Sequence, residues 1–251
     1  MIYLRRFNEN KESIESICQK YSIYNYTINE DGTIDVDGNV MLSDQGLTKL
    51  PVKFRNVTGN FSCIFNELTT LQGSPKSVGG YFDCSRNKLT TLEGCPQYVG
   101  GGFYCSNNQL VSLEGAPQSV GRDFNCSHNQ LVSLESGPQS VGGEFLCSYN
   151  QLTTLEGSPK SVDGFICSNN KLTTLEGGPL SVDSYFYCSY NQLVNLEFIP
   201  SCKDIYLENN PIYKWWEMVN DINKLDAFID LGIDARDTDF MNQEKIDLLK
   251  E

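Results

Sequence analysis

A cysteine that recurs at nearly constant spacing constrains the fold of this chain more than any other feature. It occupies Cys63, Cys84, Cys105, Cys126, Cys147, Cys167 and Cys188, with steps of 21 residues and one step of 20. Self-similarity at a period of roughly 20 to 29 residues is typical of a solenoid, in which each unit buries its apolar face only against its neighbours. The sequence therefore predicts a stack of rungs, each one repeat long, rather than a globule around one central core.

Each repeat contains a short segment with the period of a β-strand. In Phe103-Tyr104-Cys105, the Phe and the Cys are constant between repeats and the residue between them varies. Because side chains alternate along a strand, we expect Phe and Cys to point inward, together with two Leu and one Val per repeat. A buried free Cys behaves as a small hydrophobe. The expected column of core rings is Phe61, Phe82, Phe103, Phe124, Phe145, Phe165 and Phe186.

Two further constant features have structural interpretations. An Asn follows each Cys by three residues, as Asn87 and Asn108 do, and its amide can both donate and accept hydrogen bonds. We expect the stacked Asn column to satisfy backbone groups in the turn after each strand. In most repeats the Phe comes four residues after the Val, as Phe82 follows Val78, and we expect the extra residue to form a bulge where paired glycines such as Gly79-Gly80 tolerate unusual backbone angles.

The spacing Phe-x-Cys-x-x-Asn-x-Leu-x-x-Leu, seen from Phe103 to Leu113, resembles that of a leucine-rich repeat. The match covers about residues 40–212, and the unit of 20–21 residues is similar to the short bacterial type found in secreted effector proteins. The chain departs from that type by using Glu-Gly where Leu-Pro is common and Phe where Leu is common. It also resembles uncharacterised repeat proteins of tailed phages and bacteria. The resemblance implies a curved parallel β-sheet whose concave face binds a partner, usually a protein.

The predicted fold class is therefore a repeat solenoid, a leucine-rich-repeat curved parallel β-sheet of about nine rungs. Residues 1–39 are expected to form an N-terminal cap made of a helix and a β-hairpin. Residues 40–210 are expected to form the solenoid itself, and residues 211–251 a C-terminal helical cap. The 40 residues after Pro211 are too few for the large catalytic domain that effector relatives with ubiquitin-ligase activity carry.

The two caps are predicted from local patterns. Apolar residues at helical spacing indicate a helix that begins near Asn10, and alternating runs on either side of Asp31-Gly32 indicate the hairpin. Apolar residues at a 3.6-residue period indicate a helix after Pro211. Its Trp215 and Trp216 could bind a ligand, but we favour a role in closing the open end of the stack, because an uncapped edge invites aggregation.

Charge and cysteine usage narrow the classes of partner and compartment. The net charge of -13 weighs against binding to a phosphate backbone and favours a basic partner, with acidic nucleic-acid mimicry as a further alternative. Ten cysteines with no Cys-x-x-Cys or Cys/His pair indicate reduced core thiols rather than a metal site. Reduced thiols favour a cytoplasmic location, which is the host cytoplasm if the chain is phage-encoded. No signal peptide and no membrane span are expected.

The varying positions of the repeat are the candidate binding surface. They are the residues between Phe and Cys and the residues two after Cys, which we expect to share one face of the sheet. Large aromatic residues gather there, and Tyr offers a rigid contact area with a polar tip. Exposed Tyr could also merely suit a β-sheet surface. The predicted partner-binding residues are Arg86, Tyr104, His128, Tyr149, Tyr185, Tyr187, Tyr190 and Tyr206.

The sequence offers weaker signals for other chemistry. One acidic residue follows the second Leu in each of six successive repeats: Glu93, Glu114, Glu135, Glu156, Glu176 and Glu197. This acidic column could bind a cation, but we favour a solvated acidic edge. His128 lies near Cys126 in sequence, but that Cys is expected to point into the core. A solenoid places equivalent residues of neighbouring repeats side by side, so a carboxylate pair such as Asp123 and Glu144 is only a weak signal of catalysis. We therefore predict a non-enzymatic protein-binding module without cofactor or metal, with a small-molecule binder for a nucleotide or sugar as the alternative.

Overall fold

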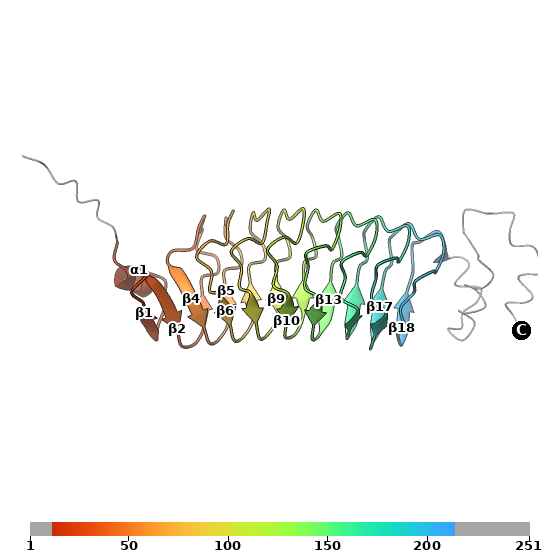
Figure 1. The fold of residues 1–251 in the computed structure, drawn as a ribbon. Coiled ribbons are helices and arrows are strands. Elements are labelled where there is room, and N and C mark those ends of the chain that lie inside the picture. Colours follow the sequence, from red (N-terminus) through yellow and green to blue (C-terminus); the bar gives the residue numbers. More distant parts are fainter. Residues whose placement is uncertain (1–11, 214–251) are drawn as a thin grey trace, which may run out of the picture.

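The computed structural model describes residues 12–213, which form one row of stacked rungs (Figure 1). The stack begins with helix α1 (Ile14–Lys20) and a hairpin of β1 (Tyr26–Ile28) and β2 (Thr33–Val36). The hairpin has the predicted turn at Asp31-Gly32. The helix starts later than predicted, because Ser13 is its N-cap and accepts a hydrogen bond from the backbone N–H of Ser16. The predicted C-terminal helices, with both tryptophans, lie outside the described residues.

Nine parallel strands, one from each rung, form the larger sheet. They pair in chain order, so that each core Phe lies in register with the Phe of the next rung. The bounds are β3 Val40–Met41, β5 Phe61–Ser62, β7 Phe82–Asp83, β9 Phe103–Tyr104, β11 Phe124–Asn125, β13 Glu144–Leu146, β15 Gly164–Ile166, β17 Tyr185–Tyr187 and β18 Asp204–Tyr206. The prediction of a parallel solenoid of about nine rungs is confirmed.

A second set of short strands precedes the first set along the chain within each rung that has both, and a sharp corner separates the two strands. It carries the recurring Val, as in Ser77-Val78, and it continues the sheet that begins with the N-terminal hairpin. The bounds are β4 Lys53–Val57, β6 Ser77–Val78, β8 Tyr98–Val99, β10 Ser119–Val120 and β12 Ser140–Val141, with β14 Ser161–Val162 and β16 Ser181–Val182 as a separate pair. Each rung therefore has strands on two sides of its core.

The paired glycines form the corner between these two strands, for a reason that the sequence interpretation missed. Gly79, Gly80 and Gly100 do not have left-handed φ angles. A Cβ atom on Gly100 would instead collide with the carbonyl oxygen of Gly79 in the rung below. Glycine is required at this corner because successive backbones approach closely, and the expectation of unusual backbone angles was wrong.

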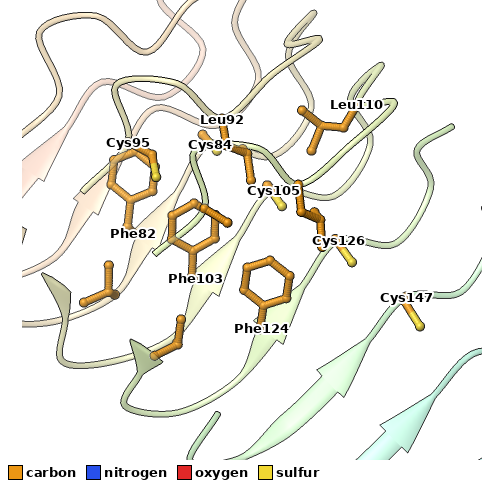
Figure 2. Packing of buried hydrophobic residues seen from close by; sticks show 14 of the residues in the cluster. Phe82, Cys84, Leu92, Cys95, Phe103, Cys105, Leu110, Phe124, Cys126 and Cys147 are labelled. Carbon is orange, nitrogen blue, oxygen red and sulfur yellow. The ribbon is translucent and has the colours of Figure 1, made fainter. Parts of the chain in front are cut away.

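The core consists of stacked columns of identical side chains (Figure 2). The seven predicted Phe rings are all buried, and neighbouring rings lie 5.3–5.6 Å apart between centroids. The Cys column runs beside them, and burial raises the pKa of these thiols, for example that of Cys105, well above the ordinary value. The predicted inward direction of Phe and Cys is confirmed, and the rungs are held together mainly by this apolar contact.

The Asn column joins each rung to the one before it. The Asn129 amide donates to the carbonyl oxygens of Cys126 at 3.0 Å in its own rung and of Cys105 at 3.1 Å in the previous rung. Its Oδ1 accepts from the backbone N–H of Leu110 at 3.0 Å. The same pattern recurs from Asn66 to Asn210. These buried amides have the structural role that the sequence predicted.

Candidate functional site

The variable positions around the nine strands form three rows along the solenoid. The leading row is the residue directly before each core Phe or its equivalent: Asn39, Asn60, Tyr81, Gly102, Asp123, Glu144, Gly164, Tyr185 and Asp204. The strand row lies between the Phe and Cys positions: Met41, Ser62, Asp83, Tyr104, Asn125, Leu146, Ile166, Tyr187 and Tyr206. The turn row lies two residues after the Cys position: Asp44, Phe65, Arg86, Asn107, His128, Tyr149, Asn169, Tyr190 and Asn209.

The eight predicted site residues fall into two groups. Four half-buried tyrosines lie on the sheet, one of them in the leading row and three in the strand row: Tyr185, Tyr104, Tyr187 and Tyr206. The other four are exposed members of the turn row: Arg86, His128, Tyr149 and Tyr190. The leading and strand rows share one face because they are two residues apart on a strand. The turn row follows the end of each strand, so its four predicted members lie beyond the strands, whereas the four tyrosines lie on them.

Every residue of the turn row has a left-handed backbone, with φ between 55° and 60°. Asn and Asp tolerate this conformation, whereas bulky side chains adopt it at a cost. Tyr149 and Tyr190 are nevertheless 51% and 57% exposed. His128 stacks on Tyr149 with 4.2 Å between ring centroids, and so it does not pair with the buried Cys126. Four members of the turn row, Phe65, His128, Tyr149 and Tyr190, are thus exposed rings at positions where local backbone preference favours Asn or Asp.

Three tyrosines form a cluster on the last two strands of the sheet. The rings of Tyr187 and Tyr206 stack with centroids 4.1 Å apart and an interplanar angle of 12°. The Tyr185 ring meets Tyr187 edge-on at 5.1 Å. The three rings are half-buried and fix one another, so this cluster presents a rigid amphipathic surface.

Tyr185 also reaches two rungs back along the sheet. Its hydroxyl donates a hydrogen bond to Glu144, across the strand that carries Gly164. A Cβ atom on Gly164 would lie 2.8 Å from the Tyr185 ring, so glycine in that rung leaves room for the ring to lie across it. The bond to the Glu144 carboxylate, together with burial, raises the pKa of Tyr185 to about 12.

A similar arrangement occurs nearer the middle of the sheet, at β9 and β11. The Tyr104 hydroxyl lies over Gly102 and points toward Asp123, with 3.5 Å between Tyr104 Oη and Asp123 Oδ2. Burial and the neighbouring Asp123 carboxylate raise the pKa of Tyr104. Tyr81 lies beside it, with 6.3 Å between ring centroids. An open hollow of about 350 Å³ adjoins these tyrosines and is also lined by Arg122.

Apart from Tyr185, the leading row was missed as part of the site by sequence reasoning. It reads Tyr81, Gly102, Asp123, Glu144, Gly164, Tyr185, so two carboxylates are flanked on each side by a glycine and then a tyrosine. This symmetric order can be seen when the repeats are aligned. Its structural consequence is that the Tyr185 ring lies across Gly164 of the neighbouring rung, and a single repeat does not show this.

The acidic column, metal binding and membrane spanning are the remaining questions that the sequence raised, and the described residues bear on each. The six Glu side chains of the acidic column are all exposed. Among residues 12–213 there is no group of three or more His, Cys, Asp and Glu side chains that could hold a metal ion. In the same range, no helix has the length and apolar character needed to cross a bilayer.

The repeat spacing and the nine parallel strands together define the architecture. The fold is a leucine-rich-repeat solenoid. No family model and no curated protein matches the chain. Among solved structures, it is similar to YopM, a leucine-rich effector protein from Yersinia pestis, with 26% identity and a TM-score of 0.49 over 68% of this chain and 49% of that one.

YopM from Yersinia enterocolitica WA-314 aligns at 15% identity and a TM-score of 0.37, over 68% of this chain and 56% of that one. The alignments thus span about half the length of these structures. At such TM-scores the likeness adds nothing to the fold, which follows from the repeat and the strand order.

Proposed function

We propose that this solenoid is a non-enzymatic recognition module that binds a protein partner on the outer face of its nine-stranded sheet. The observation that carries the proposal is a strip of large side chains in the strand row, interrupted once at Asn125. From β9 to β18, five of six successive rungs contribute one: Tyr104, Leu146, Ile166, Tyr187 and Tyr206. At about 4.8 Å per rung the strip is roughly 24 Å long.

The composition and shape of the strip favour a protein over a small molecule. Aromatic and apolar side chains with a polar surround are typical of the centre of a protein interface. A nucleotide or sugar would need a concave pocket that covers most of its surface. The described hollow near Tyr104 is open, and it adjoins only one end of the strip. The small-molecule alternative therefore has less support.

The compartment and the source of the partner belong to the same proposal. All ten cysteines are free thiols, and nine of them are buried, which fits a reducing compartment such as the cytoplasm. A host protein is the partner that the resemblance to phage repeat proteins implies.

The test is capture of binding proteins from a cell lysate, followed by affinity measurement with the purified partner. The variant Tyr187→Ala/Tyr206→Ala removes the stacked rings of the strip. The control Tyr24→Ala/Tyr98→Ala removes two tyrosines that are 68% and 63% exposed outside the three rows. Because truncating interface anchors costs about 2 kcal/mol or more, we expect the first variant to bind at least about 30-fold more weakly than wild type. Equal affinity of the two variants would contradict the proposal.

A further inference from the structure

We infer that the partner presents an arginine or lysine side chain to the middle of this face, over Asp123 and Glu144. The inference rests on the proposed function and names the chemistry of the contact. The positively charged head would lie at the two carboxylates, between the rings of Tyr104 and Tyr185.

The charge of the face is complementary to such a side chain. The leading and strand rows together contain four carboxylates, those of Asp83, Asp123, Glu144 and Asp204, and no Lys, Arg or His. The net charge of -13 adds a field of the same sign and would steer a basic surface toward the protein. The cation near this region is Arg122, an exposed residue directly before Asp123 that lines the hollow beside Tyr104.

The two central carboxylates lack a cationic partner within residues 12–213. Asp123 and Glu144 occupy the same position on neighbouring strands, because Phe124 pairs with Phe145 in the ladder, and like charges opposite each other are unfavourable. Asp123 Oδ1 accepts from the backbone N–H of Glu144 at 3.0 Å. The ion pairs of the described residues are Arg55–Asp35 and Lys88–Glu67, and neither involves this pair. A cation from outside would relieve the repulsion.

The surroundings suit a side chain with an apolar stem and a flat or compact cationic head. The Tyr185 hydroxyl donates to Glu144 and the Tyr104 hydroxyl points toward Asp123, while each carboxylate keeps further acceptor sites. Aromatic rings beside the pair can attract a cation through their faces. Leu146 and Ile166 in the adjoining strand row would pack against the methylene stem. A bare metal ion would gain nothing from these apolar and aromatic neighbours.

The experiment measures binding of a short blocked peptide, Gly-Ser-Arg-Ser-Gly, to the full chain by NMR titration. The same peptide with citrulline in place of arginine keeps the shape and removes the charge. The variant Asp123→Asn/Glu144→Gln removes two charges and keeps oxygens for both tyrosines. The matched control Glu156→Gln/Glu176→Gln removes two charges from the exposed acidic column, so that both variants have the same net charge.

We expect the arginine peptide to bind wild type and the control within about twofold, and the Asp123/Glu144 variant about tenfold more weakly, because a charge-assisted contact is lost. The citrulline peptide should bind about tenfold more weakly as well. Equal weakening by both double variants, or equal binding of both peptides, would overturn the inference. If the double variant does not fold, Glu144→Gln is compared with Glu156→Gln in the same way. Loss of partner binding in Tyr187→Ala/Tyr206→Ala tests the proposed function separately, so either idea can fail while the other stands.

Discussion

The hydrogen bonds of the Asn column allow a quantitative prediction of how much they stabilise the stack of rungs. Asn129 is buried, and the two N–H groups of its amide donate to the carbonyl oxygens of Cys105 and Cys126, with a longer shared contact to that of Ser127. Its Oδ1 accepts from the backbone N–H of Leu110. At about 1 kcal/mol net for each of these full bonds, two donated and one accepted, replacing Asn129 with Ala should lower the free energy of unfolding by about 3 kcal/mol. That is a large fraction of the roughly 5–15 kcal/mol that stabilises a typical domain.

Two comparisons separate the hydrogen bonds from simple loss of volume. Asn129→Asp keeps an oxygen for the Leu110 N–H but turns the donated bonds into contacts between a carboxylate and carbonyl oxygens, so it should be at least as destabilising as Asn129→Ala. Gln130→Ala changes an exposed neighbour and should stay within about 0.5 kcal/mol of wild type. Urea denaturation followed by far-UV circular dichroism measures all three, provided that the slope with denaturant is unchanged. A loss below about 1 kcal/mol for Asn129→Ala would refute the Asn column as a major link between rungs.

Three further predictions follow from the rows around the sheet. Tyr190 has a left-handed φ of 56°, so Tyr190→Asn should raise the free energy of unfolding by about 1 kcal/mol. The control Tyr187→Asn, on the strand, should lower it. Destabilisation by Tyr190→Asn would show that a ring in the turn row carries no backbone cost. The pKa of Tyr185, raised to about 12, predicts that this tyrosine ionises late in an absorbance titration at high pH, and Glu144→Gln should move its pKa toward 10. Because the folded pKa is the higher one, the associated stability is complete below about pH 10 and is lost as the pH rises toward 12. Finally, Gly100→Ala should destabilise by about 1–3 kcal/mol because its Cβ meets backbone of the neighbouring rung. Gly102→Ala should cost less, because its Cβ meets the hydroxyl and the outer ring atoms of Tyr104, a side chain that can move. Equal thermal midpoints for the two variants would contradict this account of the corner.

The sequence alone determined the features that repeat. The 21-residue period predicted the stack, alternation predicted that the rings of the Phe61–Phe186 column and the Cys column point inward, and the recurring Asn predicted the hydrogen-bonded Asn column. These follow from one repeat placed on identical neighbours, so a local pattern is enough. The turn signal at Asp31-Gly32 is local in the same sense.

Only the tertiary structure decided how the non-identical residues of different rungs meet. Tyr185 binds Glu144 although they are 41 residues apart, because the rung between them carries Gly164. The turn row takes a left-handed backbone after each strand, and the glycine corner is set by contact with the rung below. Such contacts depend on the side chains of two or three successive rungs at once, and a single repeat does not contain them.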